Sequence, residues 1–224
     1  MMQIQTSKKI ILYLFVLLLL GTPININFFK TDLNKFNKFE ISSLSKFNDR
    51  DIINDLSNYK FQNLFLLKEE KILETIKKYN IIEDYEFYKH YPSELVVHLK
   101  KTKFLAITKI DGINFYIGSN GKLIKTKDKL EELPIIFGKV NVVEFLKLKN
   151  LIDKSNFDFN DIKNLYFFKS KRWDIETKEG LLLKLPQKNL AESFQLFIKI
   201  INNQYLDEIN IIDLRQNDLL ILNG

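Results

Sequence analysis

The chain has 224 residues, of which 46% are hydrophobic and 13% aromatic, so it is long enough for one large or two modest domains with packed cores. Its 34 basic and 28 acidic residues give a net charge of +6, and the basic residues are mostly lysines spread along the sequence, a pattern that favours a solvated surface over a nucleic-acid site. The absence of cysteine excludes disulfide bonds, cysteine nucleophiles and cysteine-ligated zinc.

The N-terminal segment is apolar enough to interact with a membrane. Lys8 and Lys9 precede an uninterrupted apolar run over residues 10–20, and the aromatic pair Phe28-Phe29 follows a few residues later. The run alone has the length of a signal-peptide core, whereas extending it towards the aromatic pair approaches the ~20 residues of a transmembrane helix. Both interpretations direct the rest of the chain across the membrane.

No cleavage motif of small residues follows the apolar run, so an uncleaved anchor is favoured over a cleaved signal peptide. We therefore predict a transmembrane helix over residues 10–27, with a cytoplasmic N-terminus over residues 1–9. A polar linker over residues 28–38 separates this helix from the folded part of the chain.

A helix followed by a β-hairpin is predicted over residues 61–106. The apolar residues of the helix recur at helical spacing, at Ile72, Leu73, Ile76 and Tyr79. The hairpin strands alternate over residues 85–91 and 95–99, and Pro92-Ser93-Glu94 supplies the turn between them. A short strand at 39–41 and a helix capped by Asn48 or Asp49 come before this unit. The order strand, helix, helix, strand, strand indicates a small α+β module.

Strand patterns dominate the rest of the chain. The predicted strands are 104–110, 114–117, 122–124, 162–168, 173–177, 181–185, 209–214 and 219–222. Helices are predicted over 142–152 and around 190–201, the second capped by Asn189. The segment 133–138 is interpreted as an apolar loop or edge segment, because Pro134 disfavours a central strand.

Several short motifs stand in a fixed order over most of the chain. They are Asn63-Leu64-Phe65, Ile82 with Phe87, Tyr91-Pro92, Leu95-Val96-Val97, the hairpin Asn114–Ile124, Leu133-Pro134 to Gly138, Arg172-Trp173 through Leu185-Pro186, and Asp213-Leu214-Arg215. Each motif is short, but together they resemble the FtsQ/DivIB family of bacterial cell division proteins.

The resemblance implies an α+β fold with a single N-terminal transmembrane helix. A β-α-α-β-β POTRA domain would cover residues 39–106, and a mixed β-sheet domain with flanking helices would cover residues 107–224. It also implies a non-enzymatic scaffold of the bacterial inner membrane at the division septum, with a cytoplasmic N-terminus and a periplasmic body. No cofactor, nucleic acid or small-molecule substrate is expected.

The family resemblance also implies partners. FtsB- and FtsL-like single-pass divisome proteins would bind the β domain, and other septal proteins would be recruited through the POTRA domain. The chain would thereby link early and late division proteins to septal peptidoglycan synthesis.

The last strand is the expected binding edge, since a terminal strand offers unpaired N–H and C=O groups to an extended partner segment. The residues assigned to partner binding are Lys171, Arg172, Arg215, Gln216, Asn217, Asp218, Leu219, Leu220, Ile221 and Leu222. The resemblance implies that Arg172, with Lys171, offers charge to an acidic partner helix. Simpler roles stay open: Trp173 as a core residue, Arg215 in a structural ion pair, and the last strand as a packed strand.

Other function classes fit the sequence less well. His90 and His98 flank one predicted hairpin turn, with no third ligand or paired carboxylate at useful spacing, so neither a metal site nor a membrane-anchored cell-wall enzyme is favoured. A POTRA-containing translocation or assembly factor is the main alternative, but such proteins usually carry tandem POTRA modules or a following β-barrel. The export segment argues against a nucleic-acid binder.

Overall fold

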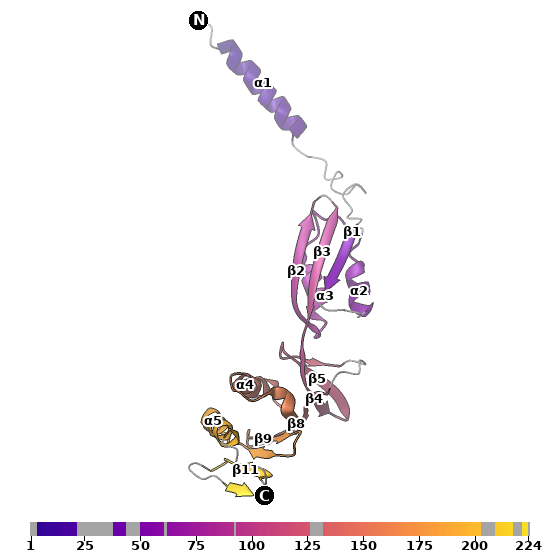
Figure 1. Ribbon diagram of the computed structural model, residues 1–224. Coiled ribbons are helices and arrows are strands. Elements are labelled where there is room, and N and C mark those ends of the chain that lie inside the picture. Colours follow the sequence, from indigo (N-terminus) through magenta and orange to yellow (C-terminus); the bar gives the residue numbers. More distant parts are fainter. Residues whose placement is uncertain are drawn as a thin grey trace. The chain divides into compact units, whose positions relative to one another are not determined.

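The computed structural model divides the chain into two compact units (Figure 1). It describes residues 4–21, 38–43, 50–60, 62–91, 93–125, 132–202, 209–216 and 221–223. The first unit comprises residues 1–79 and 85–100, and the second comprises residues 80–84 and 101–224. The boundary therefore does not follow the order of the sequence, because five residues of the second unit lie inside the sequence range of the first.

The N-terminal helix α1 runs over Ile4–Gly21 and has 18 residues. It begins earlier than predicted: Lys8 and Lys9 lie inside it rather than before it, and lysine is a good helix former. The predicted segment 22–27 lies outside the described residues. Across the part of the chain that the structure describes, no helix combines the length and the apolar character needed to cross a membrane.

The first unit has the predicted order of elements. These are β1 (Lys38–Ser43), α2 (Arg50–Ser57), α3 (Glu69–Lys77), β2 (Ile82–His90) and β3 (Glu94–Lys101). The three strands form one sheet in the order β1-β3-β2, with β1 parallel to β3. Apolar residues of both helices and of β3 are buried, among them Ile52, Leu56, Ile72, Ile76, Leu95 and Val97. The β-α-α-β-β prediction is confirmed.

The second unit is built on a nine-stranded mixed sheet in the order β12-β11-β10-β9-β8-β7-β4-β5-β6. Its strands are β4 (Phe104–Ile110), β5 (Ile113–Gly118), β6 (Leu123–Ile124), β7 (Ile135–Phe137), β8 (Ile162–Phe167), β9 (Trp173–Thr177), β10 (Leu182–Lys184), β11 (Ile211–Asp213) and β12 (Ile221–Asn223). The helices are α4 (Val142–Asp153), the short 3₁₀ helix η3 (Phe159–Asp161) and α5 (Leu190–Ile201).

The two faces of this sheet differ because side chains alternate along each strand. The register aligns five buried apolar residues across neighbouring strands: Ile136, Leu165, Ile175, Leu183 and Ile212. They share one core with buried residues of α4 and α5, such as Phe145 and Phe194, and both helices lie on the same side of the strands in Figure 1. We call the opposite face of the sheet the open face.

One prediction about this sheet is wrong. The segment 133–138 is not a loop or an edge, since β7 lies in the middle of the sheet between β4 and β8. Pro134 stands just before the strand, where its missing N–H is not needed, and its carbonyl oxygen accepts a hydrogen bond from the Ile107 N–H at 2.9 Å.

Candidate functional site

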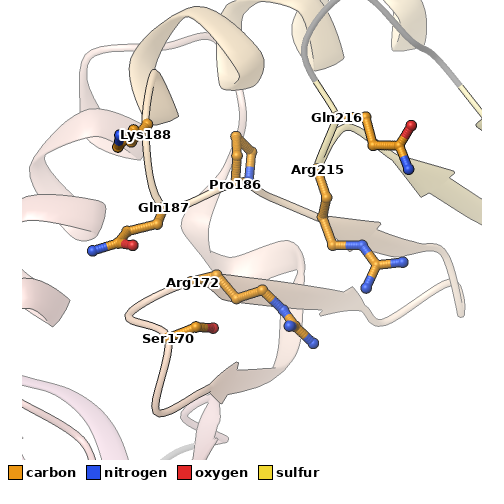
Figure 2. Close-up of a pocket in the computed structure, with 7 residues that line it drawn as sticks. All are labelled: Ser170, Arg172, Pro186, Gln187, Lys188, Arg215 and Gln216. Atoms are coloured by element: carbon orange, nitrogen blue, oxygen red, sulfur yellow. The ribbon is translucent and has the colours of Figure 1, made fainter.

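A basic cavity of about 650 Å³ lies where β9, β10 and β11 meet their loops (Figure 2). Its lining residues are Ser170, Arg172, Pro186, Gln187, Lys188, Arg215 and Gln216. They come from the β8–β9 turn, the segment after β10 and the segment after β11. Three of them are basic and none is acidic, so the cavity attracts negatively charged groups.

Arg172 is held by its own turn. The turn closes with hydrogen bonds from the Lys171 N–H to the Phe168 carbonyl oxygen (2.8 Å) and from the Phe168 N–H to the Arg172 carbonyl oxygen (3.2 Å). The Arg172 guanidinium carbon lies 3.9 Å from the centroid of the Phe168 ring, a cation–π contact. Its Nε lies 3.7 Å from Oδ1 of Asp174, which is an ion pair but too long for a hydrogen bond.

Arg215 is held more firmly, by Asp213. Its Nε donates to both carboxylate oxygens of Asp213, at 2.8 and 2.9 Å, and its Nη2 donates to Oδ2 at 2.5 Å. The Arg215 backbone N–H also donates to Asp213 Oδ1 at 3.1 Å. The side-chain hydrogen bonds from Arg215 lower the pKa of the Asp213 carboxyl, so this aspartate stays ionised well below neutral pH.

Asp174 is in a different electrostatic position. Burial raises the pKa of its carboxyl, and the nearby charges of Arg172, Arg215 and Lys184 act against that effect. Within the described residues, Asp174 Oδ1 and Arg172 Nε are both buried without a hydrogen-bond partner, so they face each other as a charge pair alone.

A guanidinium group binds a carboxylate through several N–H donors at once. Figure 2 shows the guanidinium groups of Arg172 and Arg215 pointing towards the same region, while Gln187 and Lys188 lie on the other side of Pro186. The cavity is thus lined by one lysine and by two guanidinium groups that each pair with an aspartate, an arrangement suited to carboxylate groups.

Two family models match the chain and together cover most of it. Residues 106–215 match the model described as "Cell division protein FtsQ/DivIB, C-terminal", and residues 34–101 match the "POTRA domain, FtsQ-type". The chain belongs to the FtsQ/DivIB family. The cavity residues from Ser170 to Arg215 lie within the range of the first model.

Two cell division FtsQ proteins are similar to this chain at low identity. The protein from Rickettsia bellii (strain RML369-C) is 24% identical over 160 residues, which cover 71% of this chain and 57% of the relative. The protein from Bradyrhizobium diazoefficiens is 23% identical over 167 residues, which cover 71% of this chain and 48% of the relative. The chain thus spans about half the length of these relatives.

A solved structure is also similar, at 13% identity and a TM-score of 0.33. It is the major extracytoplasmic domain of the cell division protein DivIB from Geobacillus stearothermophilus. The match covers 47% of this chain and 98% of that one.

The structure brings three of the residues predicted from the FtsQ/DivIB resemblance into the cavity, namely Arg172, Arg215 and Gln216. Lys171 lies in the same β8–β9 turn but is exposed and not part of the lining. Residues 217–220 lie outside the described residues, so the structure does not place them.

The last two predicted residues, Ile221 and Leu222, lie in β12, which pairs with β11 and comes last in the sheet order. Across the described residues no strand pairs with the outer edge of β12, and the Ile221 side chain is 44% exposed. Trp173 is 2% exposed and belongs to the core, which confirms the structural interpretation of this residue.

Sequence reasoning missed four lining residues and both aspartates. Ser170 lies in the same turn as Arg172, whereas Pro186, Gln187 and Lys188 lie next to Arg172 only through the β9–β10 pairing. The aspartates did leave a signal: Asp174 follows Arg172 by two residues, and Asp213 precedes Arg215 by two.

The histidines do not form a metal site with other residues that the structure describes. In those residues, no group of three or more histidine, aspartate or glutamate side chains is arranged to hold a metal ion. His98 instead contacts the Tyr88 ring edge-on, with ring centroids 5.2 Å apart.

Proposed function

We propose that this chain is a non-enzymatic scaffold of the divisome, anchored in the bacterial inner membrane at the division septum with its β domain in the periplasm. It would bind FtsB- and FtsL-like proteins through that domain and link early and late division proteins to septal peptidoglycan synthesis. Membership of the FtsQ/DivIB family supports the division role. The observation that carries the binding mode is an edge strand, β12, that lies next to a basic cavity.

The edge strand supplies backbone pairing. β12 pairs with β11 through Ile211↔Asn223, Ile212↔Leu222 and Asp213↔Ile221, which leaves its outer edge to an extended partner segment. Each added hydrogen bond contributes only about 0.5–1.5 kcal/mol. Five or six such hydrogen bonds therefore barely offset the cost of ordering the partner. Side-chain contacts must add affinity and specificity.

The basic cavity supplies those side-chain contacts. Arg215 and Gln216 lie just beyond the end of β11, after Leu214, so an acidic partner segment that continues past the paired strand would reach the cavity at the same end of the sheet. Arg172, Lys188 and Arg215 would then meet carboxylates of the partner. Confinement of both proteins to one membrane raises their effective concentration without further contacts.

Proline in the last strand predicted from the sequence, residues 219–222, tests this mode of binding. Leu220→Pro or Leu219→Pro removes a backbone donor and should abolish pull-down of an FtsB-like protein while circular dichroism stays unchanged. Leu220→Ala is the matched control, because it shortens the same side chain but keeps the N–H group. Undiminished binding by a well-folded proline variant would exclude pairing at this strand.

A further inference from the structure

A row of alternating charges crosses the open face beside the cavity. Asp174 of β9 lies opposite Lys184 of β10, and Lys184 lies opposite Asp213 of β11. Ile221 of the edge strand β12 comes next in the same row. Opposite residues of the antiparallel pair β9–β10 have Cβ atoms about 4.5–5.5 Å apart. The charge of Lys184 acts to lower the pKa of both Asp174 and Asp213, which is a favourable charge interaction with each carboxylate.

The cavity arginines lie beside this row, both on the same side of it. Arg172 lies two residues before Asp174, and Arg215 lies two residues after Asp213, so each arginine projects towards the face of its aspartate. Both aspartates are nearly buried, at 6% and 8% exposed, although they belong to the face that points away from α4 and α5. The ion pairs show that the long arginine side chains lie against them.

We propose that Asp174, Lys184 and Asp213 form a charge ladder that positions Arg172 and Arg215 for partner binding, although none of the three lines the basic cavity. This inference deepens the proposed function and rests on it. Asp174 holds Arg172, Asp213 holds Arg215, and Lys184 between them keeps the two carboxylates from repelling each other. The three are positioning residues and make no contact with the partner.

The need for such a ladder follows from the charge of the cavity. Arg172, Lys188 and Arg215 repel one another, and long basic side chains are mobile unless something holds them. A partner that had to order them would bind more weakly, because it would lose that entropy on association. Holding the guanidinium groups in advance removes this cost from the binding step.

The burial of Asp174 gives further support to the charge ladder. Its carboxyl is buried, and burial opposes ionisation, whereas the charges of Arg172, Arg215 and Lys184 favour it. A neutral side chain would fit this place in the sheet without that conflict. A buried carboxylate whose charge is unfavourable for folding, but which pairs with Arg172 at 3.7 Å, fits a role in holding Arg172.

The first experiment measures the arginine side chains in the full-length chain, labelled with ¹⁵N-arginine. The chain contains only three arginines, Arg50, Arg172 and Arg215, so their Nε–H signals can be assigned by single substitutions. The heteronuclear NOE should show rigid Nε–H groups for Arg172 and Arg215 in the wild type. Asp174→Asn should lower the NOE of Arg172 alone, and Asp213→Asn that of Arg215.

The matched control is Glu176→Gln on the same strand and the same face. Glu176 accepts hydrogen bonds from Asn164 Nδ2 (3.0 Å) and the Tyr166 hydroxyl (2.7 Å), and it pairs with Lys163 at 3.3 Å, so it contacts other residues than the arginines. The Glu176→Gln substitution should leave the NOE of Arg172 and of Arg215 unchanged. Asp174→Glu keeps the charge and should restore part of the Arg172 NOE.

The second experiment measures binding of the same variants to an FtsB-like protein encoded in the same genome and co-expressed with the chain. Asp174→Asn and Lys184→Met should weaken the complex about tenfold, as for the loss of one favourable charge interaction, and Glu176→Gln should not. The ladder is overturned if Arg172 stays rigid in Asp174→Asn, or if Glu176→Gln weakens binding as much. A wild-type chain that does not bind would contradict the proposed function, and the NOE values would still decide the ladder.

Discussion

At the scale of single residues, the two aspartates next to the cavity arginines affect folding in opposite ways. Hydrogen bonds from Arg215 lower the pKa of Asp213, so its ionised form favours the folded state. Burial raises the pKa of Asp174, so its ionised form disfavours the folded state. The stabilisation from Asp213 is present above its unfolded pKa of about 3.9 and is lost as the pH falls through the lower folded pKa.

Asparagine substitutions should separate these effects. Asp213→Asn should lower the free energy of unfolding at pH 7 by about 1 kcal/mol, a modest value because the Arg215 side chain is 40% exposed. Asp174→Asn should not lower the free energy of unfolding, because it removes a charge that burial makes unfavourable. Urea unfolding at pH 7, and again at acid pH as the pH falls through the lowered folded pKa of Asp213, measures both effects on the free energy of unfolding. Equal losses from the two variants at pH 7 would contradict this account.

Residue-scale prediction from sequence found the cavity arginines but not what holds them. Arg172 and Arg215 belong to the motifs of the resemblance, Gln216 was assigned to partner binding beside Arg215, and all three line the cavity. Lys188 could not be found, because its place depends on the β9–β10 pairing and not on its neighbours in sequence. The pairing of Lys184 with both aspartates likewise requires the register of three strands.

At the scale of elements, local patterns predicted hairpins and helices well. The helix over 142–152 corresponds to α4, and its Asn141 cap accepts hydrogen bonds from the N–H groups of Val143 and Glu144. β7 was missed because its pairing is non-local: it runs parallel to both β4 and β8, which lie far from it in sequence. A proline beside a short apolar run therefore favoured a loop or an edge segment over a central strand.

Gly138, which follows β7, should be intolerant of any side chain. Its φ is +100°, and a Cβ there would lie 2.1 Å from the backbone carbonyl oxygen of Phe167. Gly138→Ala should therefore cost at least about 2 kcal/mol from strain and overlap together. Gly180→Ala is the control, because its φ is +95° but no atom lies within 4 Å of the added Cβ. Chemical denaturation compares the two, and similar losses would show that the Phe167 contact does not matter.

At the scale of the whole molecule, the sequence predicted two successive modules, and the structure has two compact units with the expected α+β elements. The proposed topology across the membrane rests on the apolar run that follows Lys8 and Lys9. Because the chain has no natural cysteine, one introduced cysteine is its only thiol, and topology can be measured without background.

Thiol labelling in intact spheroplasts should reveal this topology. A membrane-impermeant maleimide should modify Glu192→Cys, at an exposed position of α5, before lysis. Ser7→Cys in α1 should react only after lysis, because it is expected on the cytoplasmic side. Labelling of both variants before lysis would contradict a cytoplasmic N-terminus.

The assignment of residues 80–84 to the second unit has a consequence for chimaeras that combine domains of two related proteins. Asn120 Nδ2 donates to the carbonyl oxygens of Asn80 (2.8 Å) and Ile82 (3.1 Å), and Ser119 Oγ donates to Glu83 Oε2 (2.5 Å). A chimaera joined near residue 101 would combine these five residues from one parent with Ser119 and Asn120 from another. Functional recombinants should therefore inherit residues 80–84 together with the β domain, even though the two are separated in the gene.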